Sequence, residues 1–363
     1  MTPRDVCRWV NWASSERVCS GSSPRLACYR VNGTLCGVSS FETVLVAVLP
    51  VYLLLAIGFF LRRRRFLPVE VDAGLMKLVI HFLYPCFILH SILGNSLVRD
   101  FSLVASGIGL GFSLIVIASG VAWLVSHFLK IQSGPERRTF CQAGGVQNYG
   151  YTAVPLLMVL DFGTGSSDES GVLGVLFVHN LGVEFALWIV GVMILTGEGL
   201  KSWRFLLNGP LVAVVLGLTL ANLGLENYLA LSEGPLLGRV VRQAMNWLGL
   251  CAFPLALLLI GATIGDLLGK ERLKWNVSLG SVLVRNVLMA GVILSAAKFL
   301  PLAMELRPVL VVQAAMPAAV TPILMARLYG GRPQVAVQVV ITTSAVGILT
   351  IPLVIAWGLS WIF

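Results

Sequence analysis

Long apolar runs recur along the chain after a polar stretch at positions 1–40. A helix needs about 20 apolar residues to cross a hydrocarbon core of about 30 Å, and most of these runs reach that length. They lack the alternation of apolar and polar positions that marks barrel strands, and a helix satisfies its own backbone hydrogen bonds in lipid. The pattern therefore predicts an all-α polytopic membrane protein of about ten spans. These spans are expected at 41–61, 73–94, 102–129, 139–160, 171–196, 208–224, 237–267, 277–300, 309–329 and 334–361.

Composition supports the same class of protein. Of 363 residues, 57% are hydrophobic and 12% charged, and a mean hydropathy of +0.88 excludes a water-soluble domain. The net charge of +9 is carried by residues at the ends of spans, without interleaved aromatic residues on one polar face. It reports membrane topology, so we expect the lipid bilayer as a partner and no nucleic acid.

The basic residues also predict an orientation. Arg62 to Arg65 directly follow the first span, which places that end in the cytoplasm. Alternating the sides from there puts fourteen Lys and Arg on the cytoplasmic side and five on the other, leaving positions 1–40 out of the count. We expect a multi-pass protein of the cell membrane, the cytoplasmic membrane in a bacterial host, with both termini extracytoplasmic.

Positions 1–40 form a predicted extracytoplasmic tail. This tail holds no apolar core of the length that a signal peptide requires, so the first span is expected to direct membrane insertion. Its four cysteines fit two disulfides in an oxidising compartment, or free thiols in an unstructured tail. These cysteines are Cys7, Cys19, Cys28 and Cys36.

The two halves of the chain show weak internal similarity. Segments 83–89 and 252–258, 142–144 and 313–315, and 154–158 and 321–325 match in order and in corresponding spans. Five spans per half is an odd number, so the second copy must enter the membrane upside down, as in secondary transporters. We expect a first repeat at 41–200 and an inverted second repeat at 201–363.

Helix-breaking residues lie inside the fourth and ninth spans, which correspond in the two repeats. In such folds a substrate binds at mid-membrane, where interrupted helices free backbone N–H and C=O groups. Close helix packing is the alternative explanation for small residues in a span. The breakers are Gly144, Gly145, Gly150 and Pro155 in the fourth span and Pro317 and Pro322 in the ninth; the polar residues beside them are Gln147, Asn148, Gln313 and Thr321.

Ionisable residues within spans are costly in lipid and mark candidate functional positions. Arg285 lies about nine residues into the eighth span, where it would either attract an anionic substrate or anchor the moving helices. Glu184 and His179 in the fifth span are candidates for proton coupling, with a packing role as the alternative. Coupling to H⁺ or Na⁺ and assembly as a homodimer stay open at this stage.

Two motifs are similar to a known family. The stretches 147–156 and 313–330 resemble the paired crossover motifs of the auxin efflux carrier family, as do Tyr84-Pro85 and Arg285. The resemblance covers about 41–361 and implies crossing broken helices four and nine, with Asn148 and Pro317 at the crossover. Gln147 and Ala318 depart from the plant carriers, as does the short link between the halves, so the chain looks like the shorter bacterial permease branch.

We therefore expect a secondary transporter that moves a small organic anion, a carboxylate or an auxin-like acid, by alternating access. The predicted substrate-binding residues are Tyr84, Gln147, Asn148, Arg285, Gln313, Pro317 and Thr321. A substrate-binding sensor or a channel-like protein is the alternative. The chain has no GxSxG, HExxH or P-loop motif, so we expect neither an enzyme nor a cofactor or metal.

Overall fold

The computed structural model describes residues 41–160, 171–199, 209–229, 234–267 and 273–363. The predicted N-terminal tail and its cysteines lie outside these residues. So does the expected boundary between the two repeats near residue 200. The division of the chain into two inverted repeats stays a prediction.

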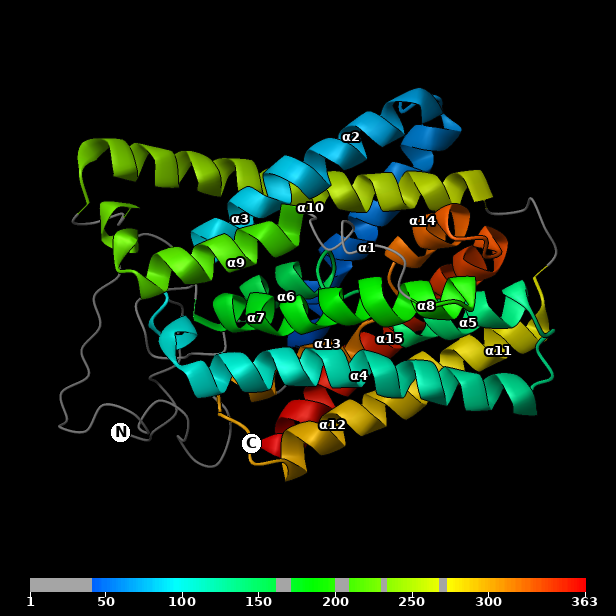
Figure 1. The fold of residues 1–363 in the computed structure, drawn as a ribbon. Coiled ribbons are helices and arrows are strands. Elements are labelled where there is room, and N and C mark those ends of the chain that lie inside the picture. The colour runs from blue at the N-terminus through cyan, green and yellow to red at the C-terminus, as the bar shows by residue number, and fades with distance from the viewer. Residues whose placement is uncertain (1–40, 161–170, 200–208, 230–233, 268–272) are drawn as a thin grey trace, which may run out of the picture. The chain divides into compact units, whose positions relative to one another are not determined.

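Helices make up most of the described residues, and the described part of the chain contains no β-strand apart from one isolated bridge (Figure 1). Seven helical stretches are long and apolar enough to cross a membrane. This finding confirms the prediction of an all-α polytopic membrane protein. The seven stretches are Val44–Arg63, Val69–Ile92, Phe101–Phe128, Gly171–Thr196, Leu236–Asp266, Trp275–Phe299 and Pro333–Ile362.

The remaining expected spans are shorter helices. The sixth is α9 (Gly209–Asn222), with 14 residues. The fourth is divided into α5 (Pro135–Gly145) and α6 (Ala153–Val159), and the ninth into α13 (Leu306–Ala315) and α14 (Thr321–Leu328). Helix breaks therefore occur in the two spans where Gly and Pro predicted them.

The helices sort into two bundles by their packing. Bundle A contains α1 (Phe41–Arg63), α2 (Asp72–Leu78), α3 (Tyr84–Ile92), α9 and α10 (Leu236–Leu267). Bundle B contains α4 (Phe101–Phe128), α5, α6, α7 (Gly171–Ala186), α8 (Val192–Thr196), α11 (Trp275–Val282), α12 (Met289–Phe299), α13, α14 and α15 (Pro333–Ile362). The bundles meet chiefly where α1 packs on α15 and where α3 packs on α7.

Glycines allow the closest helix pairs. A Cβ on Gly111 of α4 would overlap the carbonyl oxygen of His179 on α7, and a Cβ on Gly182 would overlap that of Ile108. In bundle A, Gly261 of α10 lies equally close to the backbone of α1. Small residues are typical of such contacts in membranes, because lipid gives helices no hydrophobic reason to associate and dispersion forces must act at short range.

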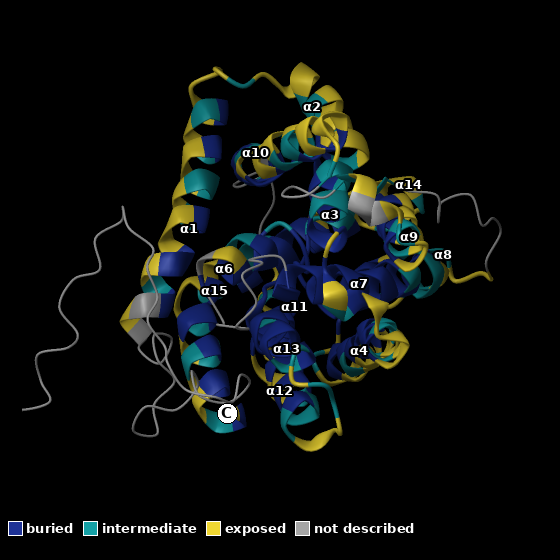
Figure 2. Ribbon diagram, turned by 90° about the vertical axis from the view of Figure 1, so that its left-hand side faces the viewer, coloured by how far each residue is buried: buried dark blue, intermediate teal, exposed yellow. Residues whose placement is uncertain are grey.

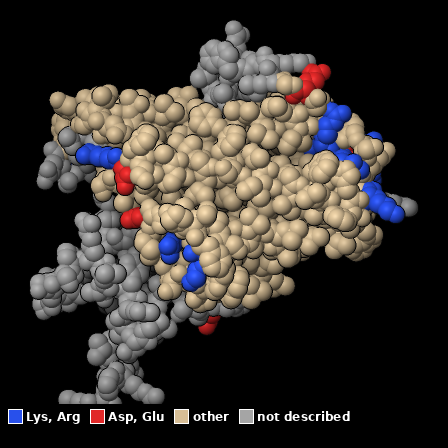
Figure 3. Space-filling model, turned by 60° about the horizontal axis from the view of Figure 1, so that its bottom comes forward, with Lys and Arg blue, Asp and Glu red and all other residues tan. Residues whose placement is uncertain are grey.

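Burial follows the expectation for a protein in lipid. Helices α1 and α10 expose apolar side chains on their outer faces, whereas α7 and α13 are almost entirely buried (Figure 2). On the face shown in Figure 3, Lys and Arg gather toward two opposite ends and leave a broad uncharged band between them. A band of this kind suits the hydrocarbon region of a bilayer.

Ion pairs join helices at the end of the bundles that the charge pattern assigns to the cytoplasm. In bundle A, Arg62 binds Asp72 and also Asp266, whose carboxylate lies 3.1 Å from its Nε. In bundle B, the buried carboxylate of Glu136 lies 2.6 Å from Lys274 Nζ and 3.2 Å from Arg332 Nη1. Each bundle is thus tied internally.

Replacing Glu136 by glutamine should destabilise bundle B. The substitution keeps the shape but removes the charge that two cations share, and we expect a loss of about 1–2 kcal/mol because both cations are half exposed and screened by water. Thermal unfolding in detergent checks this, with the exposed Glu70→Gln as control. Equal unfolding temperatures for the two variants would contradict a stabilising role.

Candidate functional site at the crossover of the broken helices

The two helix breaks cross each other in the middle of the protein. Helix α5 ends at Gly145 and the backbone turns extended at Val146, and α13 ends at Ala315 with Met316 extended. Gly145 lets α5 approach α4, because a Cβ there would lie 2.5 Å from Ser119 Oγ. A proline at the start of α14, Pro322, suits the first turn of a helix, where its missing N–H has no partner to lose.

Backbone hydrogen bonds hold the crossing segments together. The N–H of Asn148 donates to the carbonyl of Pro317 over 2.7 Å, and the N–H of Ala319 donates to Val146 over 2.9 Å. Between them, Gln147 and Ala318 form a single antiparallel bridge. The crossover is therefore a miniature two-stranded pairing that satisfies backbone groups which the broken helices would otherwise leave unbonded in the membrane.

A cleft opens on one side of this crossover, between the bundles. It encloses about 330 Å³, counting its open mouth. Its polar lining comes from Tyr52 of α1, Asn148, Thr152 and Ser344 of α15, and Pro317 and Ala318 add crossover backbone. The rest is apolar, with no charged residue among the described residues that line it.

Asn148 and Thr152 are linked within the cleft. The Asn148 amide donates to the Thr152 hydroxyl over 2.8 Å, and its oxygen accepts from the Thr152 N–H over 3.4 Å. Asn148 is 8% exposed and Thr152 4%. Helix α6 begins directly after Thr152, and α14 begins at Thr321, directly after the cleft residue Val320. The starts of two short helices therefore lie at the cleft, and Val154 and Ile323 in their first turns already donate their N–H groups to backbone carbonyls.

Gln313 is hydrogen-bonded to the crossover outside the cleft. Its amide donates to the carbonyl of Tyr149 over 3.2 Å and to Asn180 Oδ1 over 3.3 Å. Asn180 also donates to the Tyr149 carbonyl, over 3.0 Å. His179 Nδ1 lies 3.4 Å from Asn180 Oδ1. Gln313 and His179 are fully buried and do not line the cleft, so they fix the loop after Asn148.

Tyr84 meets the crossover from bundle A. Its ring packs 5.5 Å from that of Tyr151 and 6.0 Å from that of Phe177, both in bundle B. Gly150 is required here, because a Cβ on it would lie 2.7 Å from the Tyr84 hydroxyl. Tyr84 thus contacts the site from across the bundle interface rather than lining the cleft.

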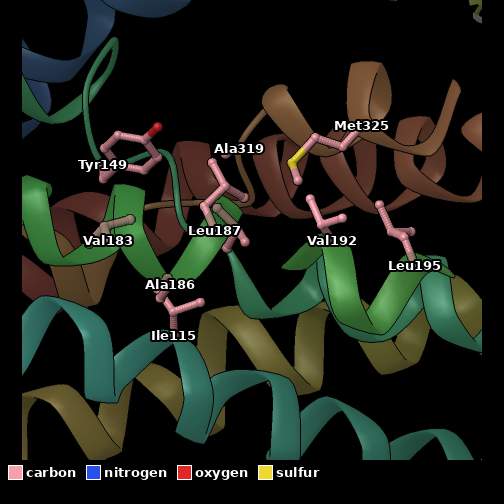
Figure 4. Packing of buried hydrophobic residues seen from close by; sticks show 10 residues of the cluster. Ile115, Tyr149, Val183, Ala186, Leu187, Val192, Leu195, Ala319 and Met325 are labelled. Atoms are coloured by element: carbon pink, nitrogen blue, oxygen red, sulfur yellow. The ribbon is translucent and has the colours of Figure 1, made fainter. Parts of the chain in front are cut away.

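Glu184 accepts two hydrogen bonds beside the crossover. Tyr149 donates its hydroxyl over 2.6 Å, and Trp188 donates its indole N–H over 2.9 Å. Tyr149 belongs to a cluster of buried apolar residues that also includes Val183 and Leu187 of α7 and its π-helical continuation. Figure 4 shows the Tyr149 ring lying over α7, near these two residues. The carboxylate is thus joined to the loop that carries Asn148.

Arg285 lies in bundle B, in the π-helical stretch η7 (Leu283–Leu288), and is fully buried. It is not among the residues that line the cleft, and neither is Gln147. Both were predicted to bind substrate, and neither contributes to the cleft that Asn148 lines.

Several residues of the site were not predicted. Thr152, Asn180, Tyr52 and Thr343 hold or line the crossover, the last by accepting the N–H of Ala318 over 3.1 Å. Their signal in the sequence is only a single polar side chain in an apolar span. Asn180 would have been the easiest of them to predict from the sequence, because it directly follows His179, which was a candidate.

An all-α bundle that crosses the membrane, with two broken helices crossing beside a small cleft between bundles, defines a membrane transport protein. A family model described as membrane transport protein matches residues 43–355, and the chain belongs to this family, the auxin efflux carrier family. The match confirms the resemblance in the crossover motifs. A comparison with proteins of curated function gives no match.

Proposed function

We propose that this protein is a secondary transporter of a small organic anion, and that the substrate binds in the cleft at the crossover. The observation that carries the proposal is the position of Asn148 and Thr152, which offer polar side chains at the junction of two interrupted helices and two bundles. A ligand held there contacts both bundles, so rocking of one against the other would expose it to each side in turn.

The substrate class follows from the lining. An amide and a hydroxyl present hydrogen-bond donors at the cleft, and the N-termini of α6 and α14 lie beside them and favour negative charge. The apolar remainder of the lining suits a hydrocarbon or aromatic body. A carboxylate or an auxin-like acid meets these conditions. No catalytic role is assigned to any of these residues.

The same proposal assigns coupling to Glu184 and His179, with H⁺ or Na⁺ as the driving ion. Glu184 bonds to Tyr149, and His179 lies beside Asn180, which bonds to the same loop. A change of charge at either residue would act on the backbone next to Asn148. Tyr84, Gln313, Pro317 and Thr321 are proposed to position the site.

The test begins with binding. Detergent-purified protein is heated with monocarboxylates, dicarboxylates, indole acids and neutral analogues, and a ligand at about 100 times its Kd should stabilise it by about 2.7 kcal/mol. Compounds that stabilise the protein are then assayed for flux in liposomes. Binding without flux would contradict transport and favour a sensor.

Asn148→Ala should weaken binding of such a ligand by about 10- to 100-fold, because a hydrogen bond to a charged group contributes about 1.5–3 kcal/mol. The exposed Asn222→Ala on α9 is the control and should bind normally. Titration of each variant with the ligand measures the two affinities. Unchanged affinity in a folded Asn148→Ala protein would remove the cleft as the binding site.

A further inference from the structure

The buried guanidinium of Arg285 has no hydrogen-bond partner in the part of the chain that the structure describes. The residue is 0% exposed, and none of its Nε, Nη1 and Nη2 atoms has a hydrogen-bond partner among the described residues. A charge buried in a membrane protein without compensation costs several kcal/mol, and such residues normally pair with another group.

The helices around Arg285 supply no carboxylate for it. Stretch η7 packs against α4, α5 and α15 and continues into α11 and α12. The described residues of these five helices contain a single acidic side chain, Glu136, and it is paired with Lys274 and Arg332. The neighbouring helices therefore leave a positive charge inside bundle B.

Gln147 presents a second unsatisfied group nearby. It is 0% exposed, and neither its Oε1 nor its Nε2 has a partner among the described residues. It forms the extended bridge with Ala318, and successive side chains of an extended segment point to opposite faces. Asn148 lines the cleft between the bundles and Gln147 does not, so the buried Gln147 amide is directed away from the cleft.

The residues before and after Arg285, Val284 and Asn286, both contact segments next to Gln147. Val284 lies against Gly144, where an added Cβ would be 3.8 Å from Val284 Cγ1. Asn286 donates to the carbonyl of Thr343 over 3.3 Å. The Thr343 hydroxyl in turn accepts from the N–H of Ala318, the bridge partner of Gln147. Arg285 therefore sits at the level of the crossover, on the side that Gln147 faces.

We propose that Arg285 and Gln147 bind a small anion inside bundle B, behind the crossover and separate from the cleft. The anion is chloride or a carboxylate group. The guanidinium supplies up to five N–H donors and the compensating charge, and the Gln147 amide supplies two more. Because Gln147 is part of the bridge, the anion would stabilise the crossing of the two broken helices.

Thermal unfolding in chloride against isethionate, a larger sulfonate without a carboxylate group, tests the site at constant ionic strength. Without organic substrate, chloride should raise the unfolding temperature of the wild type by about 5 °C at saturation. Acetate and malonate are measured in the same way. A shift with chloride identifies an inorganic anion, and a shift with the carboxylates alone identifies a carboxylate group.

Variants separate this site from the cleft. Arg285→Met should lose the anion-dependent shift and unfold at a higher temperature than the wild type in isethionate, because it removes the uncompensated charge. Asn148→Ala should keep the shift in full, although it loses ligand binding in the cleft. If Arg285→Met fails to fold, anomalous scattering from crystals grown in bromide should place an ion beside Arg285.

The proposal is overturned if none of the anions changes the unfolding temperature. It is also overturned if Arg285→Met responds as the wild type does, or if bromide is not found at Arg285. Loss of the shift in Asn148→Ala would place the anion in the cleft instead. The proposed transport function is tested separately, by the ligand-binding and flux assays. A failure of the anion site and a failure of the transport proposal are therefore distinguishable.

Discussion

Gly111→Ala should destabilise the folded protein by about 3 kcal/mol, at the upper end of the range for overpacking. The added methyl group would overlap the carbonyl oxygen of His179, and it would lie 3.0 Å from the N atom of Val183. Both are backbone atoms of α7, so no side-chain rotation relieves the contact. The helices α4 and α7 must move apart.

Gly109→Ala is the matched control for this substitution. Gly109 lies two positions away on the same helix, and a Cβ there meets nothing within 4 Å. Alanine favours a helix over glycine by up to about 1 kcal/mol, so this variant should be as stable as the wild type or slightly more stable. Unfolding temperature in detergent compares the two. Equal values for Gly111→Ala and Gly109→Ala would show that the α4–α7 pair is looser than the structure describes.

The effect of Gly111→Ala should extend to function. Helix α7 carries Asn180 and Glu184, which bond to the loop after Asn148. A shift of α7 away from α4 would therefore move the support of the crossover. We expect weaker ligand binding even in the fraction of protein that remains folded.

The fold was predictable from the sequence to the extent that hydropathy decides it. Apolar runs of sufficient length have few alternatives to membrane helices, because lipid leaves no other way to satisfy the backbone. The breaks were predictable as well, since Gly144, Gly145 and Pro317 interrupt spans that are otherwise uniform. Grouping into bundles was not, because nothing in the sequence indicates that α1 packs on α10, which lies in the other half of the chain.

The site was predicted in part. Asn148 and Pro317 line the cleft, and Gln313 and Glu184 lie beside the crossover; that they bind substrate or couple its transport stays a prediction. The direction of each side chain was not predictable, because it depends on the extended backbone at the crossing. As a result, Asn148 lines the cleft and Gln147 does not. Thr152 was not predicted, because a single hydroxyl in an apolar span has an ordinary alternative role, a hydrogen bond to the backbone of its own helix.

Glu184→Gln should abolish the response of transport to an imposed ion gradient while leaving exchange of substrate across the membrane intact. Glutamine has the same shape and keeps one oxygen for the Trp188 N–H, and its amide can donate to Tyr149, whose hydroxyl accepts as well as donates. The crossover therefore keeps its support. What the variant loses is the ability to change charge.

Two assays in liposomes separate coupling from structure. Net uptake driven by a pH gradient should fall to its value without a gradient, whereas counterflow exchange, which needs no net movement of protons, should continue. His179→Gln tests the second candidate. Among the described residues, the tyrosines at the site are titratable as well: Tyr52, Tyr84, Tyr149 and Tyr151. Equal loss of uptake and exchange in Glu184→Gln would assign Glu184 a structural role at the crossover. A gradient response that persists in both variants would exclude the pair from proton coupling and leave Na⁺ as the ion to test.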